Sequence, residues 1–179
     1  MRNILYKSEN IIPWDTQSAF KMSSYNTVCE DNMVFCYIKA YVHKTDLVIC
    51  SYCFTEEPAD YANMHLYLGV NAAAGGEIIR IDYGYNGIEA TESGLPRSAV
   101  TFRSFKADDE QGFYWCGEIT IDGSFIAQHS GSPLEEKSIL TLNLTQSFKN
   151  GDTAALFGDV TEKEYNRAAE AQAFVVLNY

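Results

Sequence analysis

A chain of 179 residues with 46% hydrophobic and 13% aromatic content can fill one hydrophobic core and is short for two. We therefore expect a single domain over residues 1–179. The formal net charge is −11, from 24 acidic and 13 basic residues. Such a molecule repels nucleic acid and anionic membranes, so neither is an expected partner, and neutral ligands stay open.

The N-terminal stretch "MRNILYKSENIIPW" contains no continuous apolar segment and no small-residue cleavage site. No secretory signal is therefore visible. The sequence also contains no run that could span a membrane. We expect a cytoplasmic protein, or an extracellular one if a leader has been removed.

Alternating hydrophobicity predicts β-strands along most of the chain. In "MVFCYIKAYV", residues 33–42, Cys36 and Ile38 share one face while Tyr37 and Tyr41 share the other. Turn residues separate further predicted strands. These strands fall within residues 47–54, 63–71, 77–87, 98–105, 112–121, 138–148, 153–157 and 173–178. About ten short strands, each with one polar face, predict an all-β fold, an antiparallel sandwich of two sheets.

One window near the C-terminus has helical character. "TEKEYNRAAEAQA" at 161–173 opens with a capping box from Thr161 to Glu164, and Tyr165 and Ala168 follow at helical spacing. We expect one short C-terminal helix here, lying over an edge or end of the sandwich.

The cysteines lie inside apolar runs, and an odd number of them cannot all pair within one chain. Reduced, buried thiols are therefore expected at Cys29, Cys36, Cys50, Cys53 and Cys116. "CSYC" at 50–53 has the spacing of a redox or zinc half-site. Its surroundings, "LVICSYCF", are β-rich throughout, and no second pair follows at zinc spacing, so we favour buried thiols.

The aromatic run in "QGFYWCGEITID", residues 111–122, raises the question of a ligand platform. Strand parity places Phe113 and Trp115 on the core side and Tyr114 and Glu118 on the outward side. A bulge at Gly117 would change that assignment.

The same stretch resembles the late strand of family 9 carbohydrate-binding modules and their DOMON-like relatives. The resemblance rests on Trp115, Glu118 and Ile121, with Asp122 where the group usually has Pro. "TVCEDNMVFCYIKAYV", "MHLYLGVN", "IIRIDYGYNG", "LFGDV" and "AFVVLNY" are similar to other segments of the group, in the same order. The resemblance implies a jelly-roll-like sandwich and sugar binding, which in the best-known members uses two Trp residues. It also implies an N-terminal anchoring role for Trp14.

Sugar binding needs aromatic side chains that stack on a pyranose and polar side chains that bond its hydroxyls. We expect a non-catalytic carbohydrate site in which six side chains converge on one concave surface. These are Tyr37, Tyr67, Arg80, Asp82, Tyr114 and Glu118.

Several alternatives stay open for these residues. The tyrosines can simply pack under loops, and Arg80 can form an ion pair with Asp82 or Glu118 on a solvated face. A protein-interaction domain is one alternative function. A carbohydrate-active enzyme is another, with Asp82 and Glu118 as the carboxylate pair that glycoside hydrolysis requires.

Cofactors are not expected, apart from a structural calcium ion. Some DOMON relatives bind haem through Met and His, but Met64 and His65 are neighbours on a strand and face opposite sides. Family 9 modules often hold calcium, and "ADDEQG" at 107–112 offers hard oxygen ligands for a structural calcium ion.

Overall fold

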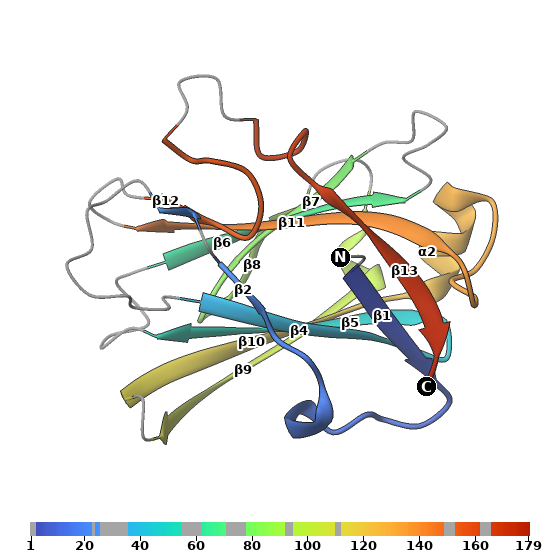
Figure 1. The fold of residues 1–179 in the computed structure, drawn as a ribbon, viewed down its shortest axis with the longest axis horizontal. Coiled ribbons are helices and arrows are strands. Elements are labelled where there is room, and N and C mark those ends of the chain that lie inside the picture. Colours follow the sequence, from blue (N-terminus) through green and yellow to red (C-terminus); the bar gives the residue numbers. More distant parts are fainter. Residues whose placement is uncertain are drawn as a thin grey trace.

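A computed structural model describes residues 3–22, 24–25, 36–54, 62–70, 78–91, 95–109, 112–148, 153–161 and 166–179. Most of the regular structure is β-strand (Figure 1). The strands are β1 (Asn3–Ser8), β2 (Phe20–Lys21), β3 (Ser24–Tyr25), β4 (Cys36–His43), β5 (Asp46–Phe54), β6 (Ala62–Val70), β7 (Ile78–Gly84), β8 (Gly87–Thr91), β9 (Val100–Asp109), β10 (Gly112–Ile121), β11 (Ile139–Phe148), β12 (Thr153–Ala155) and β13 (Gln172–Asn178). The α-helix among them is α2 (Gly123–Ser130), and short 3-10 turns lie at Trp14–Thr16 and Arg97–Ala99.

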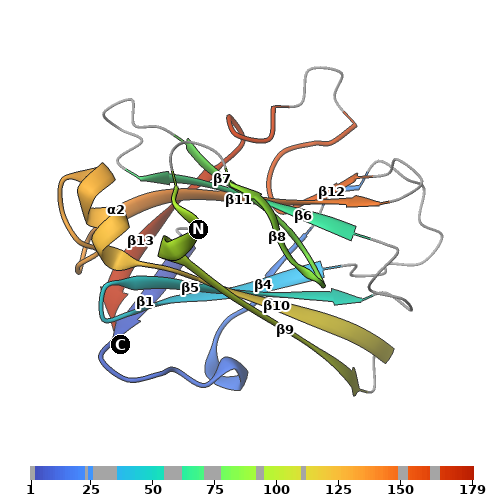
Figure 2. The ribbon, with the colours of Figure 1, turned by 180° about the vertical axis from the view of Figure 1, so that it is seen from behind.

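Two antiparallel blocks form the sheet, and Figures 1 and 2 show them one above the other. The upper block has the strand order β8-β7-β6-β11-β13, and the lower block has the order β4-β5-β10-β9. Strand β1 lies between the blocks and pairs in parallel with both β13 and β4. These ten strands therefore form one mixed sheet, to which β2 also belongs through a pair with β4, and β12, with β3 beside it, through a pair with β11.

This connection corrects the predicted fold class. The protein is all-β, but it is a single sheet curled into a nearly closed barrel, not an antiparallel two-sheet sandwich. At the open seam, Ser104 Oγ of β9 donates to the carbonyl of Tyr85, next to β8, at 2.7 Å. The prediction was wrong because β1 has no alternating pattern: Leu5 is its one fully buried side chain.

One core fills the space between the blocks. Trp115, Tyr83 and Phe174 are its largest fully buried side chains. The two blocks approach closely at Gly117, where an added Cβ would lie 3.0 Å from the rings of both Trp115 and Tyr83. The predicted burial of Trp115 is confirmed, and Gly117 admits the close packing of these rings because it has no side chain.

The predicted burial of Phe113 is wrong. Its side chain is 63% exposed, although strand parity does place it on the same side as Trp115. Tyr114 forms the last pair between β10 and β5, with Phe54, and beyond it β10 pairs only with β9. Phe113 therefore lies past the end of the core.

The helix predicted over 161–173 is not present in the described part of that window. Residues 167–170 form a turn, 172–173 begin β13, and Glu164 of the proposed capping box lies outside the described residues. The observed helix is α2, where Asp122 Oδ1 accepts from the backbone amide of Ser124 at 2.6 Å. Gly131 ends α2 with φ at 79°, the left-handed conformation that glycine adopts without strain.

Four of the predicted thiols are free and buried: Cys36, Cys50, Cys53 and Cys116. Cys29 lies outside the described residues. Cys53 faces the core, while Cys50 packs on the outward side of β5. Residues three apart on a strand face opposite sides, so the "CSYC" sequence does not form a single redox or metal site.

Candidate functional site

The outward side of the lower block carries a cluster of aromatic side chains, here called the aromatic face. Strand alternation brings them together from β4, β5, β9 and β10. The ring centroids of Tyr37 and Tyr52 are 4.6 Å apart at an interplanar angle of 14°. The ring of Tyr114 lies 6.0 Å from Tyr52 and 5.5 Å from Phe54. The aromatic face consists of Tyr37, Tyr52, Phe54, Phe105 and Tyr114.

Exposure decreases from the edge of the aromatic face to its centre. Phe105 is 40% exposed, Tyr37, Phe54 and Tyr114 are half-buried, and Tyr52 is 9% exposed. Burial, with Cys50 and Cys116 nearby, raises the pKa of Tyr52. Its phenol therefore stays protonated at neutral pH.

A charged rim borders the aromatic face. Glu118 accepts two hydrogen bonds from Arg103, both at 2.8 Å, and one from Trp14 Nε1 at 3.0 Å. Lys39 Nζ donates to the backbone carbonyl of Trp14 at 2.6 Å and lies 5.7 Å from the ring centre of Tyr52. These contacts hold the N-terminal segment against the sheet and leave Arg103, whose side chain is 70% exposed, at the surface.

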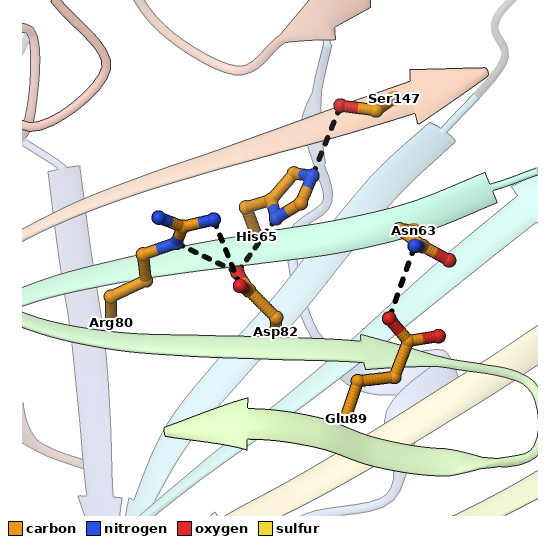
Figure 3. A network of polar contacts seen from close by, with 6 residues as sticks. All are labelled: Asn63, His65, Arg80, Asp82, Glu89 and Ser147. Atoms are coloured by element: carbon orange, nitrogen blue, oxygen red, sulfur yellow. Dashed lines mark hydrogen bonds and ion pairs between the residues drawn. The ribbon is translucent and has the colours of Figure 1, made fainter. Parts of the chain in front are cut away.

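The outward side of the upper block carries polar residues instead (Figure 3). His65 Nδ1 lies 2.6 Å from Asp82 Oδ1, and His65 Nε2 lies 3.0 Å from Ser147 Oγ. Arg80 binds both oxygens of Asp82, through Nε at 2.9 Å and Nη2 at 2.8 Å. These four residues, on β6, β7 and β11, are here called the polar network. Asn63 and Glu89 form a separate hydrogen bond beside it, at 3.0 Å.

His65 is held as a neutral imidazole. Burial lowers its pKa below the usual range, and this effect outweighs the hydrogen bond and negative charge of Asp82, which raise it. The positive charges of Arg167 and Arg80 lower the pKa further. At neutral pH the ring therefore has one donor and one acceptor nitrogen.

A segment near the C-terminus covers part of this face. Asn143, fully buried on β11, donates to the backbone carbonyl of Arg167 at 2.8 Å and accepts from the amide of Phe157 at 3.1 Å. Thr145, two residues further along β11, is also fully buried. Beyond Thr145, Ser147 is half-buried. Asn63, which pairs with Ser147 from the neighbouring strand β6, is exposed. The polar network is thus covered at one end and accessible at the other.

The six residues predicted as one site fall into two groups of three. Tyr37, Tyr114 and Glu118 lie on or beside the aromatic face. Tyr67, Arg80 and Asp82 lie on the outward side of β6 and β7, where Arg80 is 5.9 Å from the ring centre of Tyr67.

The two groups face away from each other. Leu66 and Ile81, the strand neighbours of Tyr67 and of Arg80 and Asp82, belong to the same core as Trp115, the strand neighbour of Tyr114. Outward side chains on the two sides of that core point in opposite directions. The structure therefore brings each group of three together and does not place all six on one concave surface.

Two alternatives from the sequence can be compared with this geometry. Asp82 and Glu118 lie on opposite sides of the core, so they do not form a carboxylate pair about one glycosidic bond. Arg80 pairs with Asp82 on its own strand, whereas Glu118 pairs with Arg103.

The residues proposed for haem and calcium lie as follows. Met64 faces the core, where Cys53 Sγ is 3.6 Å from its sulfur, and His65 faces outward. For calcium, the predicted 107–112 segment contains the end of β9, up to Asp109, and the first residue of β10, Gly112, while 110–111 lie outside the described residues. Within the described part of the chain, no three His, Cys, Asp or Glu side chains gather as a metal site.

Sequence reasoning missed several residues of these two faces. Tyr52 and Phe54 were hidden because β5 is apolar on both sides, so no alternation singles out the outward side. Arg103 and Phe105 lie in a predicted strand without a marked motif. Parity does place Ser147 on the outward side of β11, but nothing in the sequence joins it to His65, 82 residues away.

A scan against protein-family models finds no match, and a search of the curated proteins finds none. Among solved structures, the chain is similar to a proposed carbohydrate-binding protein from Bacteroides uniformis. The TM-score is 0.63 at 10% identity, over 90% of this chain and 87% of that one. A likeness at this identity shows a shared fold. No helix among the described residues is long and apolar enough to cross a membrane.

Proposed function

We propose that the protein is a carbohydrate-binding protein that binds a neutral sugar on its aromatic face, with no catalysis at that face. The observation that carries the proposal is the contact of aromatic rings from β4, β5 and β10, with Phe105 on the neighbouring strand β9, beside the Glu118–Arg103 pair. This surface contains three of the six residues predicted from the sequence: Tyr37, Tyr114 and Glu118.

The chemistry of the surface suits a pyranose. The C–H side of a sugar packs on exposed aromatic rings, of which Phe105 is the most accessible here. Arg103, whose side chain is 70% exposed beside the rings, offers charged donors for hydroxyl groups, and such hydrogen bonds are stronger than neutral ones. A neutral ligand also agrees with the net charge of −11, which disfavours an anionic polymer.

The structural neighbour from Bacteroides uniformis supports the same ligand class, because it shares the fold and is itself a proposed carbohydrate-binding protein. The finer assignment, to family 9 modules or their DOMON-like relatives, stays a prediction from the sequence. So do the cytoplasmic location and a structural calcium ion at residues 107–112.

A titration against a panel of neutral mono- and oligosaccharides tests the proposal. Thermal shift and Trp fluorescence would be followed, with and without calcium. We expect a saturable response to one sugar class that Tyr114→Ala or Phe105→Ala weakens about tenfold or more, a loss typical of an aromatic anchor.

Phe113→Ala is the matched control, because Phe113 is also exposed but lies on the opposite side of β10 from Tyr114. It should leave binding unchanged. A response that none of the aromatic-face variants alters, or no response to any sugar, would contradict the proposal and direct the search to protein partners.

A further inference from the structure

Three residues of the polar network form a continuous hydrogen-bonded line of nucleophile, base and carboxylate. Ser147 Oγ is 3.0 Å from His65 Nε2, and His65 Nδ1 is 2.6 Å from Asp82 Oδ1 (Figure 3). We propose that Ser147, His65 and Asp82 form a second site that hydrolyses carboxylic esters with small acyl groups. This site lies on the opposite side of the core from the aromatic face, so it does not depend on the proposed sugar binding.

The protonation states required by such a site follow from the geometry. Asp82 is acceptor-only, so His65 donates through Nδ1–H and leaves Nε2 as the acceptor for the hydroxyl of Ser147. A serine hydroxyl is a weak nucleophile until an adjacent base takes its proton. His65 is that base, and Asp82 is a positioning residue that fixes its tautomer.

Nearby cations support a reaction that develops negative charge. Arg80 contacts both oxygens of Asp82 and places a positive charge beside that carboxylate. Arg167 is close enough to His65 to affect its titration, and it adds a second positive charge beside the network. Positive charge near a reacting carbonyl stabilises the oxyanion of a tetrahedral intermediate, and in the proposed reaction Arg167, beside His65, supplies it, whereas Arg80 lies at the Asp82 end of the line.

The reaction balances without a cofactor. Ser147 Oγ attacks the ester carbonyl carbon and its proton passes to His65 Nε2. The ester C–O bond then breaks, and the departing alcohol takes that proton from His65. Water attacks the acyl-serine next, giving its proton to His65, which returns it to Ser147 as the carboxylic acid leaves.

The surroundings of Ser147 limit the size of the acyl group. Thr145 and Asn143 are fully buried on one side of it along β11, whereas Asn63 is exposed across from it on β6. The substrate can therefore approach from the Asn63 side, and its acyl group meets a closed end. An acetyl ester fits these conditions.

Two measurements on the full chain test the proposal. A fluorophosphonate probe should label Ser147, located by mass spectrometry of the digested protein. The hydrolysis of p-nitrophenyl acetate should fall about 100-fold or more in Ser147→Ala and in His65→Gln, the range that general-base catalysis contributes. The acid limb of the wild-type rate should have its midpoint below pH 6.5, because the pKa of His65 is lowered from 6.5.

Controls separate catalysis from a structural role. Ser104→Ala removes another half-buried serine at the barrel seam and should leave both readouts unchanged. Asp82→Asn should lower the rate and shift its pH profile in a protein that still folds. Absence of label on Ser147, or equal hydrolysis by wild type and Ser147→Ala, would overturn the proposal while leaving sugar binding to its own test.

Discussion

The aromatic face and the polar network lie on outward sides of the same curled sheet, yet their side chains are held in different ways. On the aromatic face, Tyr37, Tyr52 and Tyr114 contact one another mainly through their rings. In the polar network, Asp82 accepts from both Arg80 and His65, and Ser147 completes the line. The aromatic face presents apolar rings next to charged side chains, whereas the polar network is a line of hydrogen-bonded side chains.

The difference is the basis for proposing a different function for each face. Exposed aromatic rings suit a ligand that packs its apolar side on them. A fixed line from Ser147 through His65 to Asp82 suits a reaction in which a proton must move between named atoms. Strand parity placed both groups outward, but the partners of each residue decide its role.

The largest expected effect compares neighbours on β10. Trp115→Ala removes a fully buried indole and should cost about 3–5 kcal/mol of the free energy of unfolding. Tyr114→Ala, on the half-buried aromatic face, should cost clearly less. Urea denaturation of both variants measures the difference, and equal losses would contradict the assignment of Trp115 to the core and Tyr114 to the surface.

The next effect compares two carboxylates. Asp82→Ala leaves Arg80 and His65 without their shared acceptor in a mostly buried position, and we expect a loss of about 2–3 kcal/mol. Glu118→Ala should cost less, about 1–2 kcal/mol: the Glu118 side chain is only 11% exposed and also accepts from Trp14 Nε1, but its ion-pair partner Arg103 is 70% exposed and water can replace that contact. Denaturation at low salt tests this order, which a larger loss for Glu118→Ala would reverse.

The polar network should also make stability depend on pH. The pKa of His65 is lowered in the folded protein, mainly by burial, so the unfolded chain binds that proton more tightly. The contribution of His65 to the free energy of unfolding is therefore fully present above the unfolded pKa of about 6.5. It is lost as the pH falls through the folded pKa, and it amounts to about 1.4 kcal/mol for each unit by which folding lowers that pKa. His65→Gln should flatten thermal stability between pH 7 and pH 5; an unchanged slope would contradict the assignment.

The smallest effect is expected at Phe113. Phe113→Ser replaces a side chain that is 63% exposed past the end of the core, and stability should change by about 0.5 kcal/mol or less. A loss approaching that of Trp115→Ala would show that Phe113 packs in solution. Thermal unfolding of the two variants side by side checks this.

The sequence predicted local structure better than the way the strands join. Period-two alternation located β4, β7 and β11, and parity correctly separated Tyr114 from Trp115. Alternation does not report which strands pair, so it missed β1, whose parallel pairs with β4 and β13 convert two antiparallel blocks into one sheet. The local pattern also predicted a helix over 161–173, of which the described residues form none. The observed helix is α2 at 123–130, which Asp122 caps.

The candidate sites were predictable only in part. Residue types and parity selected outward tyrosines and charges, including Tyr37, Arg80 and Glu118. They did not show that the core separates these residues into two groups, because facing depends on how the whole sheet curls. The line from Ser147 to Asp82 crosses three strands and has no local motif, so it became visible only once β11, β6 and β7 were seen side by side.

Mapping the bound sugar by NMR tests the central claim most directly. Backbone amide shifts of the labelled protein would be followed during titration with the sugar that gives a saturable thermal shift. We predict that perturbed residues cluster on the aromatic face, around Tyr37, Phe54, Phe105 and Tyr114. Perturbations centred on His65, Asp82 and Ser147, with the aromatic face unchanged, would contradict the proposed division of the two faces.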